Sequence, residues 1–156
     1  MDDKKMILET TEYLFGCDFF ADDFDPEGKE EHLDQVNELL EKYLWKDIFD
    51  AWSKYLYEKC ETPEEVINFC NLFFYYGGQD QFIPDPYKFL GYIIYKVDLD
   101  KNWDLAGDIV DSIGVSILEK SGNLSLLNDP NYQLWNDPQI QKEVDHLKAL
   151  NEEKTS

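Results

Sequence analysis

The chain has 156 residues and a formal net charge of −20, from 34 acidic residues against 14 basic ones. All of the basic residues are lysines. A surface this anionic repels phosphate backbones and lipid headgroups, and without arginine the chain lacks the usual bidentate phosphate clamp. Direct nucleic-acid binding, membrane binding and most phosphoryl-transfer chemistry are therefore disfavoured. The alternative explanation is that lysine simply replaces arginine throughout the chain and that the acidity serves only solubility.

The composition predicts one folded domain covering residues 1–156, with 151–156 as a frayed tail. Hydrophobic residues make up 43% of the chain and aromatic residues 15%, which is enough apolar material for a packed core. The most apolar stretch, 66–76, is far too short to span a bilayer.

The cysteines favour a reducing, cytoplasmic environment. Cys17, Cys60 and Cys70 form no CxxC pair, and no basic segment followed by an apolar one opens the chain. They lie within or beside apolar helical stripes, so we expect small buried hydrophobic side chains rather than reactive thiols.

Apolar spacing and start signals predict two helices in the first part of the chain. The first ends near Gly16 and is expected to bury Met6, Thr10, Tyr13 and Leu14. The second has Asp25 as its cap and Pro26 at its first position. Its apolar positions are Leu33, Val36, Leu39, Leu40, Tyr43 and Leu44.

Two further helices follow a short turn near Trp45. Residues 48–59 carry an apolar stripe, and residues 62–65 form a capping box with proline at the first helical position. The helix that follows, 66–76, is apolar on nearly every face, which is typical of an element enclosed by others. The glycines at 77–78 end it.

Three more helices are predicted in the second half of the chain. Residues 85–97 begin with an Asp-Pro start signal, and Asp104 is expected to cap a helix over 105–120 that ends before Gly122. A last helix begins at the Asp-Pro pair at 137–138.

Six or seven helices with short connections indicate an all-α fold, an irregular bundle. A helical repeat protein is the alternative, although no period of 30 to 45 residues is visible. A short strand at 92–95 is a second alternative. Residues 128–138, with Tyr132 and Trp135, are expected to form an ordered loop.

Two segments partly resemble calcium loops, and neither satisfies the pattern. The first lacks glycine at position six and glutamate at position twelve; its residues are Asp98, Asp100, Asn102 and Asp104. The second has proline within the loop and aspartate at its end; its residues are Asp23, Asp25, Glu27, Gly28 and Asp34. No metal and no cofactor is therefore expected.

No catalytic constellation is visible, so we expect that the protein is not an enzyme. The two histidines, His32 and His146, lie on predicted polar helix faces without metal-ligand spacing and are expected to be solvated. Ser112 and Ser116 fall inside a helix and lack the glycines of a nucleophile elbow.

The distribution of negative charge is more informative. The first 50 residues contain 16 acids and 5 lysines, a net charge of −11. The densest run faces only Lys29, and its members are Asp18, Asp22, Asp23, Asp25, Glu27, Glu30, Glu31 and Asp34. A second cluster has the spacing i, i+4, i+7 of one helix face: Asp104, Asp108 and Asp111. Both clusters are candidate partner-binding sites.

Aromatic residues near helix ends and turns are candidate anchors, because Tyr and Trp are enriched at interfaces. They are Tyr57, Tyr75, Tyr76, Tyr132 and Trp135. The alternative is that each forms the half-buried rim of a core.

Acidic runs and tyrosines on a small helical chain resemble the immunity proteins of bacterial toxin systems and acidic phage inhibitors. The resemblance is one of type, carried by the run 18–34 and the stripe 104–111, and it assigns no site residue. It implies a stoichiometric inhibitor that blocks a basic partner such as a toxin nuclease. A chaperone or adaptor for a basic or secreted protein is the alternative; an uncharacterised enzyme or small-ligand domain is a third.

Overall fold

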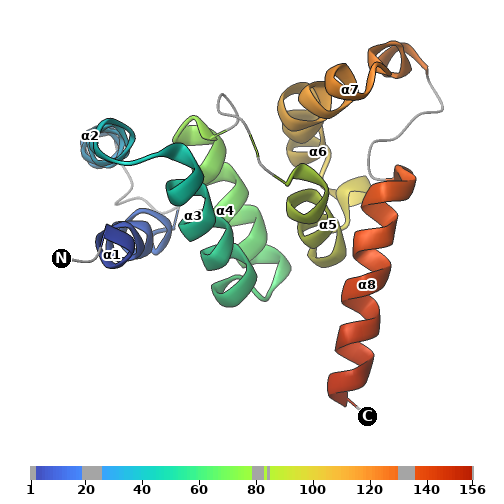
Figure 1. Ribbon diagram of the computed structural model, residues 1–156, viewed down its shortest axis with the longest axis horizontal. Helices are drawn as coiled ribbons and strands as arrows, with labels where there is room; N and C mark the ends of the chain where they lie inside the picture. The colour runs from blue at the N-terminus through green and yellow to red at the C-terminus, as the bar shows by residue number, and fades with distance from the viewer. Residues whose placement is uncertain (1–2, 19–25, 79–82, 84, 130–135, 156) are drawn as a thin grey trace. The chain divides into compact units, whose positions relative to one another are not determined.

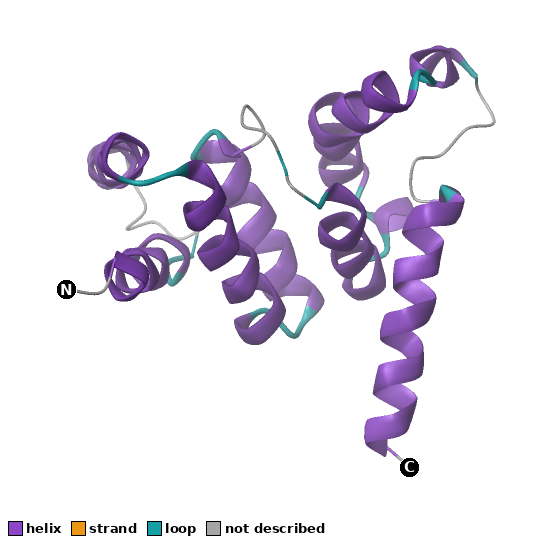
Figure 2. Cartoon of the chain, in the orientation of Figure 1, coloured by secondary structure: helices purple, strands orange, loops and turns teal. Residues whose placement is uncertain are grey.

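The computed structural model describes residues 3–18, 26–78, 83, 85–129 and 136–155. Every regular element in these ranges is a helix, so the all-α prediction is confirmed (Figure 2). The segment 92–95, considered as a strand, is helical. Contacts within the chain divide it into two compact units, Met1–Phe82 and Ile83–Ser156, and each is described by itself. No described helix is long and apolar enough to cross a membrane.

Four α-helices lie in the described residues of the first unit (Figure 1). Their boundaries agree with the sequence signals, because Pro26 and Pro63 occupy first helical positions and Thr62 and Glu65 form the reciprocal capping box. The helices are α1 (Asp3–Phe15), α2 (Pro26–Lys42), α3 (Trp45–Lys59) and α4 (Pro63–Tyr75).

An aromatic cluster centred on Phe15 joins α1, α3 and α4. Its ring stacks on Phe69 of α4 at 4.6 Å between centroids and meets Trp52 of α3 edge-on at 5.0 Å. Tyr76, the residue that caps the end of α4, lies 5.3 Å away in a T-shaped pair. The three large rings of Phe15, Trp52 and Phe69 are at most 3% exposed, so this cluster is the core of the unit.

The predicted buried face of α1 is correct at Leu14 and wrong at Met6 and Tyr13. Ile7, Thr11 and Leu14 are buried, whereas Met6 is 41% and Tyr13 47% exposed. Both stripes have helical spacing, and the choice between them depends on where α3 lies. The hydroxyl of Thr11 is satisfied within the helix by the carbonyl of Ile7 at 2.7 Å, which allows a polar residue in the core.

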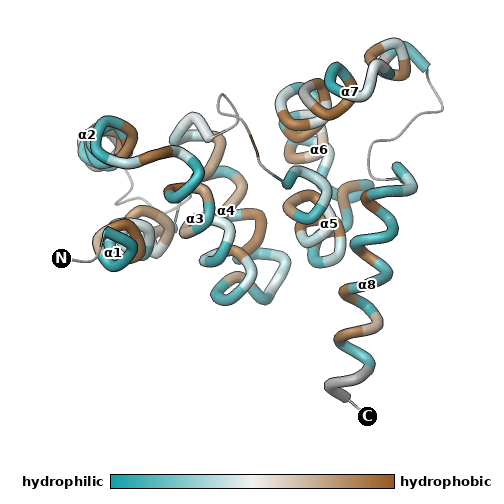
Figure 3. Tube along the Cα trace, viewed as in Figure 1, coloured by the Kyte–Doolittle hydropathy of each residue, from teal (hydrophilic) through white to brown (hydrophobic). Residues whose placement is uncertain are grey.

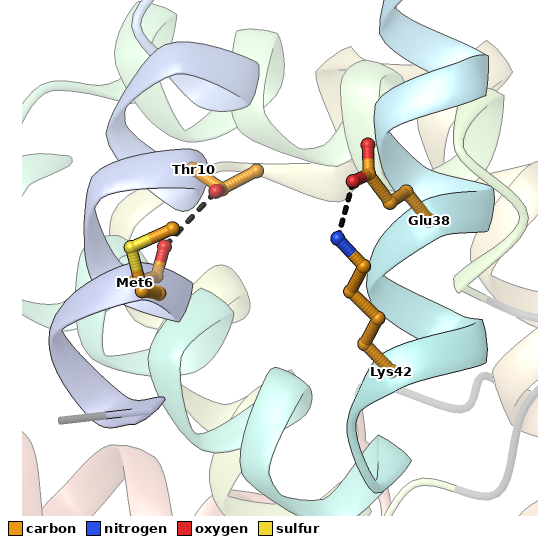
Figure 4. A network of polar contacts seen from close by, with 4 residues as sticks. All are labelled: Met6, Thr10, Glu38 and Lys42. Carbon is orange, nitrogen blue, oxygen red and sulfur yellow. Dashed lines mark hydrogen bonds and ion pairs between the residues drawn. The ribbon is translucent and has the colours of Figure 1, made fainter. Parts of the chain in front are cut away.

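The stripe of α2 is confirmed in part: Val36 and Leu39 are buried, and Leu33, Leu40 and Tyr43 are half-buried. Leu44, predicted on the same face, is 73% exposed. It lies beyond the end of α2 and caps α3 in an extended conformation, so the helical spacing no longer applies to it. Thr10 and Met6 of α1 and Glu38 and Lys42 of α2 lie along the groove between these two helices (Figure 4).

In the second unit, residues 85–129 and 136–155 form four α-helices and three short or irregular segments. They are α5 (Pro86–Lys96), η2 (Leu99–Lys101), α6 (Trp103–Ile109), η3 (Val110–Gly114, a π-helical segment), α7 (Val115–Ser121), η4 (Leu124–Asn128) and α8 (Pro138–Thr155). The residues from 151, expected to be frayed, continue α8 to Thr155. Residues 130–135 of the predicted loop lie outside the described ranges.

The helices α5 and α8 pack closely at Gly91. A Cβ placed on this glycine would lie 2.7 Å from the Cβ of Glu143, so no larger residue fits at this crossing without movement. Ile140 and Val144 of α8 are buried.

The predicted helix over 105–120 is present, but it begins earlier. Asn102 stands at the N-cap without a side-chain hydrogen bond, and Asp104 is already inside the helix, so the prediction of Asp104 as the cap is wrong. The end is as predicted, because Gly122 is left-handed with φ 77°.

Candidate functional site

The outward side of α2 forms an acidic face. Its exposed carboxylates follow the helical period, and three of the five were identified from the sequence. The acidic face of α2 consists of Glu30, Glu31, Asp34, Glu38 and Glu41. Figure 3 shows the polar, teal residues of α2 interrupted by the apolar, brown residues of its inward side.

Glu38 and Glu41 are not among the predicted residues, because they lie beyond the densest acidic run, 18–34. The period that relates Glu30 to Asp34 continues to both of them. Asp18 of the predicted set is described and exposed. The remaining members fall outside the described side chains: Asp22, Asp23, Asp25 and Glu27.

Within the described part of α2, Lys42 is the cation that offsets this charge. Its ammonium donates to the carboxylate of Glu38, one turn earlier (Figure 4). This hydrogen bond and the attraction of Glu38 raise the pKa of Lys42. Glu30 and Asp34 are one turn apart and repel each other by a few tenths of a kcal/mol, so a cation bound here would relieve repulsion.

An exposed aromatic ring adjoins the acidic face. Tyr13 of α1 is 47% exposed and stacks on His32 of α2 at 4.8 Å between centroids. Burial, and then the charge and hydrogen bond of Glu31, raise the pKa of Tyr13. Tyr75 lies close enough to Glu30 for that charge to raise its pKa in addition to burial. The apolar spacing of α1 predicts a buried Tyr13, so this residue is not among the predicted interface anchors.

His32 is buried, which corrects the prediction of a solvated side chain. It is 7% exposed, and its Nδ1 lies 2.9 Å from the hydroxyl of Tyr76. Burial lowers the pKa of His32, and Glu31 acts in the opposite direction with a smaller effect. The second histidine, His146, is exposed as predicted.

Tyr76 is part of the core rather than an interface anchor. It is 4% exposed, and its hydroxyl donates to the carbonyl oxygen of Leu14 at 2.5 Å. Burial raises the pKa of Tyr76 strongly. Among the other predicted anchors, Tyr57 is half-buried, and Tyr132 and Trp135 lie outside the described residues.

The predicted stripe on the second unit is also exposed. Asp104 and Asp108 lie on α6, and Asp111 lies in the π-helical segment η3. Trp103, at the start of the same helix, is 68% exposed. The stripe belongs to the second unit and is a candidate surface of that unit.

Residues of the first segment that partly resembles a calcium loop, which begins at Asp98, have structural roles. A carboxylate oxygen of Asp98 accepts from the backbone N–H of Asp100 at 3.0 Å, and the amide of Asn102 donates to the carbonyl of Asp98 at 2.8 Å. Both bonds close the short helix η2. Across the described residues, no group of three or more potential ligands is arranged to hold a metal ion.

A groove of about 530 Å³ opens on the first unit. Phe15, Tyr55 and Ile67 supply its apolar part, and Cys17 and Cys60 also line it. Tyr55 donates to the carbonyl of Phe15 at 3.2 Å, and Asn68 donates to that of Cys17 at 2.9 Å. These bonds hold the end of α1 against α3 and α4.

Ser112 donates to the carbonyl of Asp108, one helical turn earlier, which is a structural bond.

No protein-family model, no curated protein and no solved structure matches this chain.

Proposed function

We propose that the protein is a stoichiometric inhibitor that binds a basic protein, such as a toxin nuclease, through the acidic face of α2. The observation that carries the proposal is the accumulation of five exposed carboxylates on one side of this helix. Its other side packs through Val36 and Leu39, so the carboxylates are presented from a fixed support.

The net charge of −20 supports a cationic protein as the partner. Enzymes that act on nucleic acids have basic substrate grooves, and an anionic protein surface can occupy such a groove in place of the phosphates. Opposite charges accelerate association, while desolvated aromatic contacts slow dissociation. Tyr13 supplies an exposed ring at the edge of the acidic face.

The test compares three variants that each remove three negative charges. The first changes the acidic face of α2 through Glu30→Gln, Asp34→Asn and Glu41→Gln. The second changes the stripe of the other unit through Asp104→Asn, Asp108→Asn and Asp111→Asn. The matched control changes exposed acids elsewhere in the first unit, through Asp50→Asn, Glu58→Gln and Glu61→Gln.

Each protein is used to capture partners from a lysate of its own host, and the captured proteins are identified by mass spectrometry. We expect a basic protein that wild type and control retain and that the α2 variant loses. The purified partner should then lose activity at one equivalent of wild type. Equal loss in all three variants would mean that only the net charge matters, and loss in the second variant alone would place the contact on the other unit.

The same partner separates inhibition from a chaperone or adaptor role. An inhibitor recognises the folded active groove, so it should bind the folded partner and not the urea-unfolded chain. Equal binding to both forms, with full activity of the bound partner, would contradict the proposal.

A further inference from the structure

His32 lies where three helices of the first unit meet. Its ring is stacked between Tyr13 of α1 and Tyr76 at the end of α4, with centroid distances of 4.8 and 6.1 Å and interplanar angles of 24° and 16°. His32 itself belongs to α2, the helix that carries the acidic face. The contacts of this one side chain therefore connect α2 with α1 and α4.

The hydrogen bonds determine which nitrogen of His32 carries the proton. The carbonyl oxygen of Leu14 can only accept, so the bond of 2.5 Å to Tyr76 uses the single phenolic proton. The oxygen of Tyr76 is then the acceptor for His32, whose Nδ1 must be protonated to donate over 2.9 Å. Neutral His32 thus has its lone pair on Nε2, and a second proton binds there.

The groups facing His32 offer a small compensation for a positive charge. From α1 and the residues after it come the phenol of Tyr13, the carbonyl of Leu14 and, through Tyr76, the thiol of Cys17, whose sulfur lies 3.9 Å from the Tyr76 hydroxyl. The end of α4 supplies Tyr76. Among the described residues the anionic neighbour is Glu31 on α2, and its effect on the pKa of His32 is smaller than that of burial.

The side chain that α3 contributes to the junction is uncharged. Trp52 lies 6.1 Å from Tyr76 between ring centroids and is 1% exposed. Tyr75 contacts Tyr76 at 6.0 Å and completes the aromatic surroundings. Within the described part of the unit, the side chains around the imidazole are mainly aromatic rings, which solvate a charge less well than water does.

We propose that protonation of His32 under mildly acidic conditions loosens the junction of α2 with α1 and α4. The proton comes from solvent and binds Nε2, and no other covalent bond is made or broken. At neutral pH the junction holds the acidic face of α2 in place. In acid the open form of the junction, in which the imidazolium is hydrated, becomes more populated.

The direction of the pH dependence follows from linkage. A histidine with a lowered folded-state pKa binds protons better when it is exposed. The stability of the junction is therefore complete above the ordinary histidine pKa of about 6.5, and it is lost as the pH falls through the lower folded-state value. Any effect of acid on partner binding would rest additionally on the proposed function.

The first measurement is an NMR titration of the two histidine rings in the wild-type protein. The reference is the same ring in the urea-unfolded protein, and the signals of His32 and His146 are distinguished with His146→Asn. We expect His32 to titrate at a lower pH in the folded protein than in the unfolded one. A His32 that titrates at the same or a higher pH when the protein is folded would overturn the proposal.

The second measurement is hydrogen exchange of the α2 amides at about pH 7.5 and about pH 5.5, corrected for the intrinsic exchange rate. In wild type and in His146→Asn we expect exchange to become several-fold faster in acid. His32→Asn can keep a donor near the Nδ1 position but cannot be charged, so its exchange should not respond. An equal response in His32→Asn would assign the effect to carboxylates and refute the proposal.

Both measurements are made without a partner. If neither measurement gives the expected result, the proposed role of His32 is wrong, whatever α2 binds. If both give it while the α2 variant still binds the partner, the proposed function is wrong and the pH response remains. Should His32→Asn not fold, the titration and the wild-type exchange decide the question.

Discussion

The hydroxyl of Tyr76 donates to the carbonyl oxygen of Leu14, a residue 62 positions earlier in the chain. This bond joins the end of α4 to the end of α1. It also orients the Tyr76 oxygen as the acceptor for His32 of α2. One phenol thereby links three of the four helices of the first unit.

Replacing Tyr76 by phenylalanine should destabilise the first unit by about 1–3 kcal/mol, because two buried polar groups lose their partner. The measurement is urea unfolding followed by tryptophan fluorescence. Tyr43→Phe is the matched control, since Tyr43 is half-buried near the end of α2, and its effect should stay below about 0.5 kcal/mol. Equal effects of the two changes would mean that the Tyr76 network contributes nothing specific.

The three thiols should differ in reactivity. Burial and the charge of Glu65 raise the pKa of Cys60 to about 12, and burial raises the pKa of Cys70 as well. Cys17 is half-buried. Iodoacetamide at mildly alkaline pH should label Cys17 first, as read by peptide mass spectrometry, because thiolates are the reacting form. Faster labelling of Cys60 or Cys70 in the native protein would contradict the burial described here.

Two glycines of the second unit should respond in opposite directions to alanine. Gly122 has φ 77°, so Gly122→Ala should cost about 1 kcal/mol. Gly107 is helical, and a Cβ there meets no atom within 4 Å, so Gly107→Ala should stabilise by about 0.5–1 kcal/mol. Thermal unfolding followed by circular dichroism measures both, and stabilisation by Gly122→Ala would exclude the left-handed helix end.

The capping box of α4 should be sensitive to Thr62. The hydroxyl of Thr62 accepts from the backbone N–H of Glu65 at 3.2 Å, so Thr62→Ala should cost about 1 kcal/mol while Thr62→Ser should cost much less.

Hydrogen bonds from Thr62 lower the pKa of Glu65. The contribution of Glu65 should therefore be complete above its ordinary pKa and disappear as the pH falls through the lowered value, which urea unfolding at several pH values can measure.

Binding through the acidic face of α2 should depend steeply on salt. Exposed charges are screened over about 8 Å at physiological ionic strength, so the affinity for a labelled oligoarginine peptide should fall between low and high salt. Wild type should lose more affinity than the α2 variant defined above, as measured by fluorescence anisotropy. A salt-independent affinity would exclude these carboxylates as the binding surface.

The sequence was sufficient for the helices whose ends carry local signals. The capping box at Thr62 and the prolines at 26, 63, 86 and 138 act within one helical turn. For the same reason the exposed stripe of Asp104, Asp108 and Asp111 could be identified from its spacing alone. The acidic face of α2 was identified in part, because its period was followed only as far as Asp34.

What depended on the tertiary structure was which face of each helix is buried. Met6 and Ile7 are adjacent and similarly apolar, and the position of α3 decides that Ile7 enters the core. His32 stands in a polar sequence context, yet it is buried because Tyr13 and Tyr76 close over it. A helical period defines a set of faces, but residues far apart in the chain supply the surface against which one of them packs.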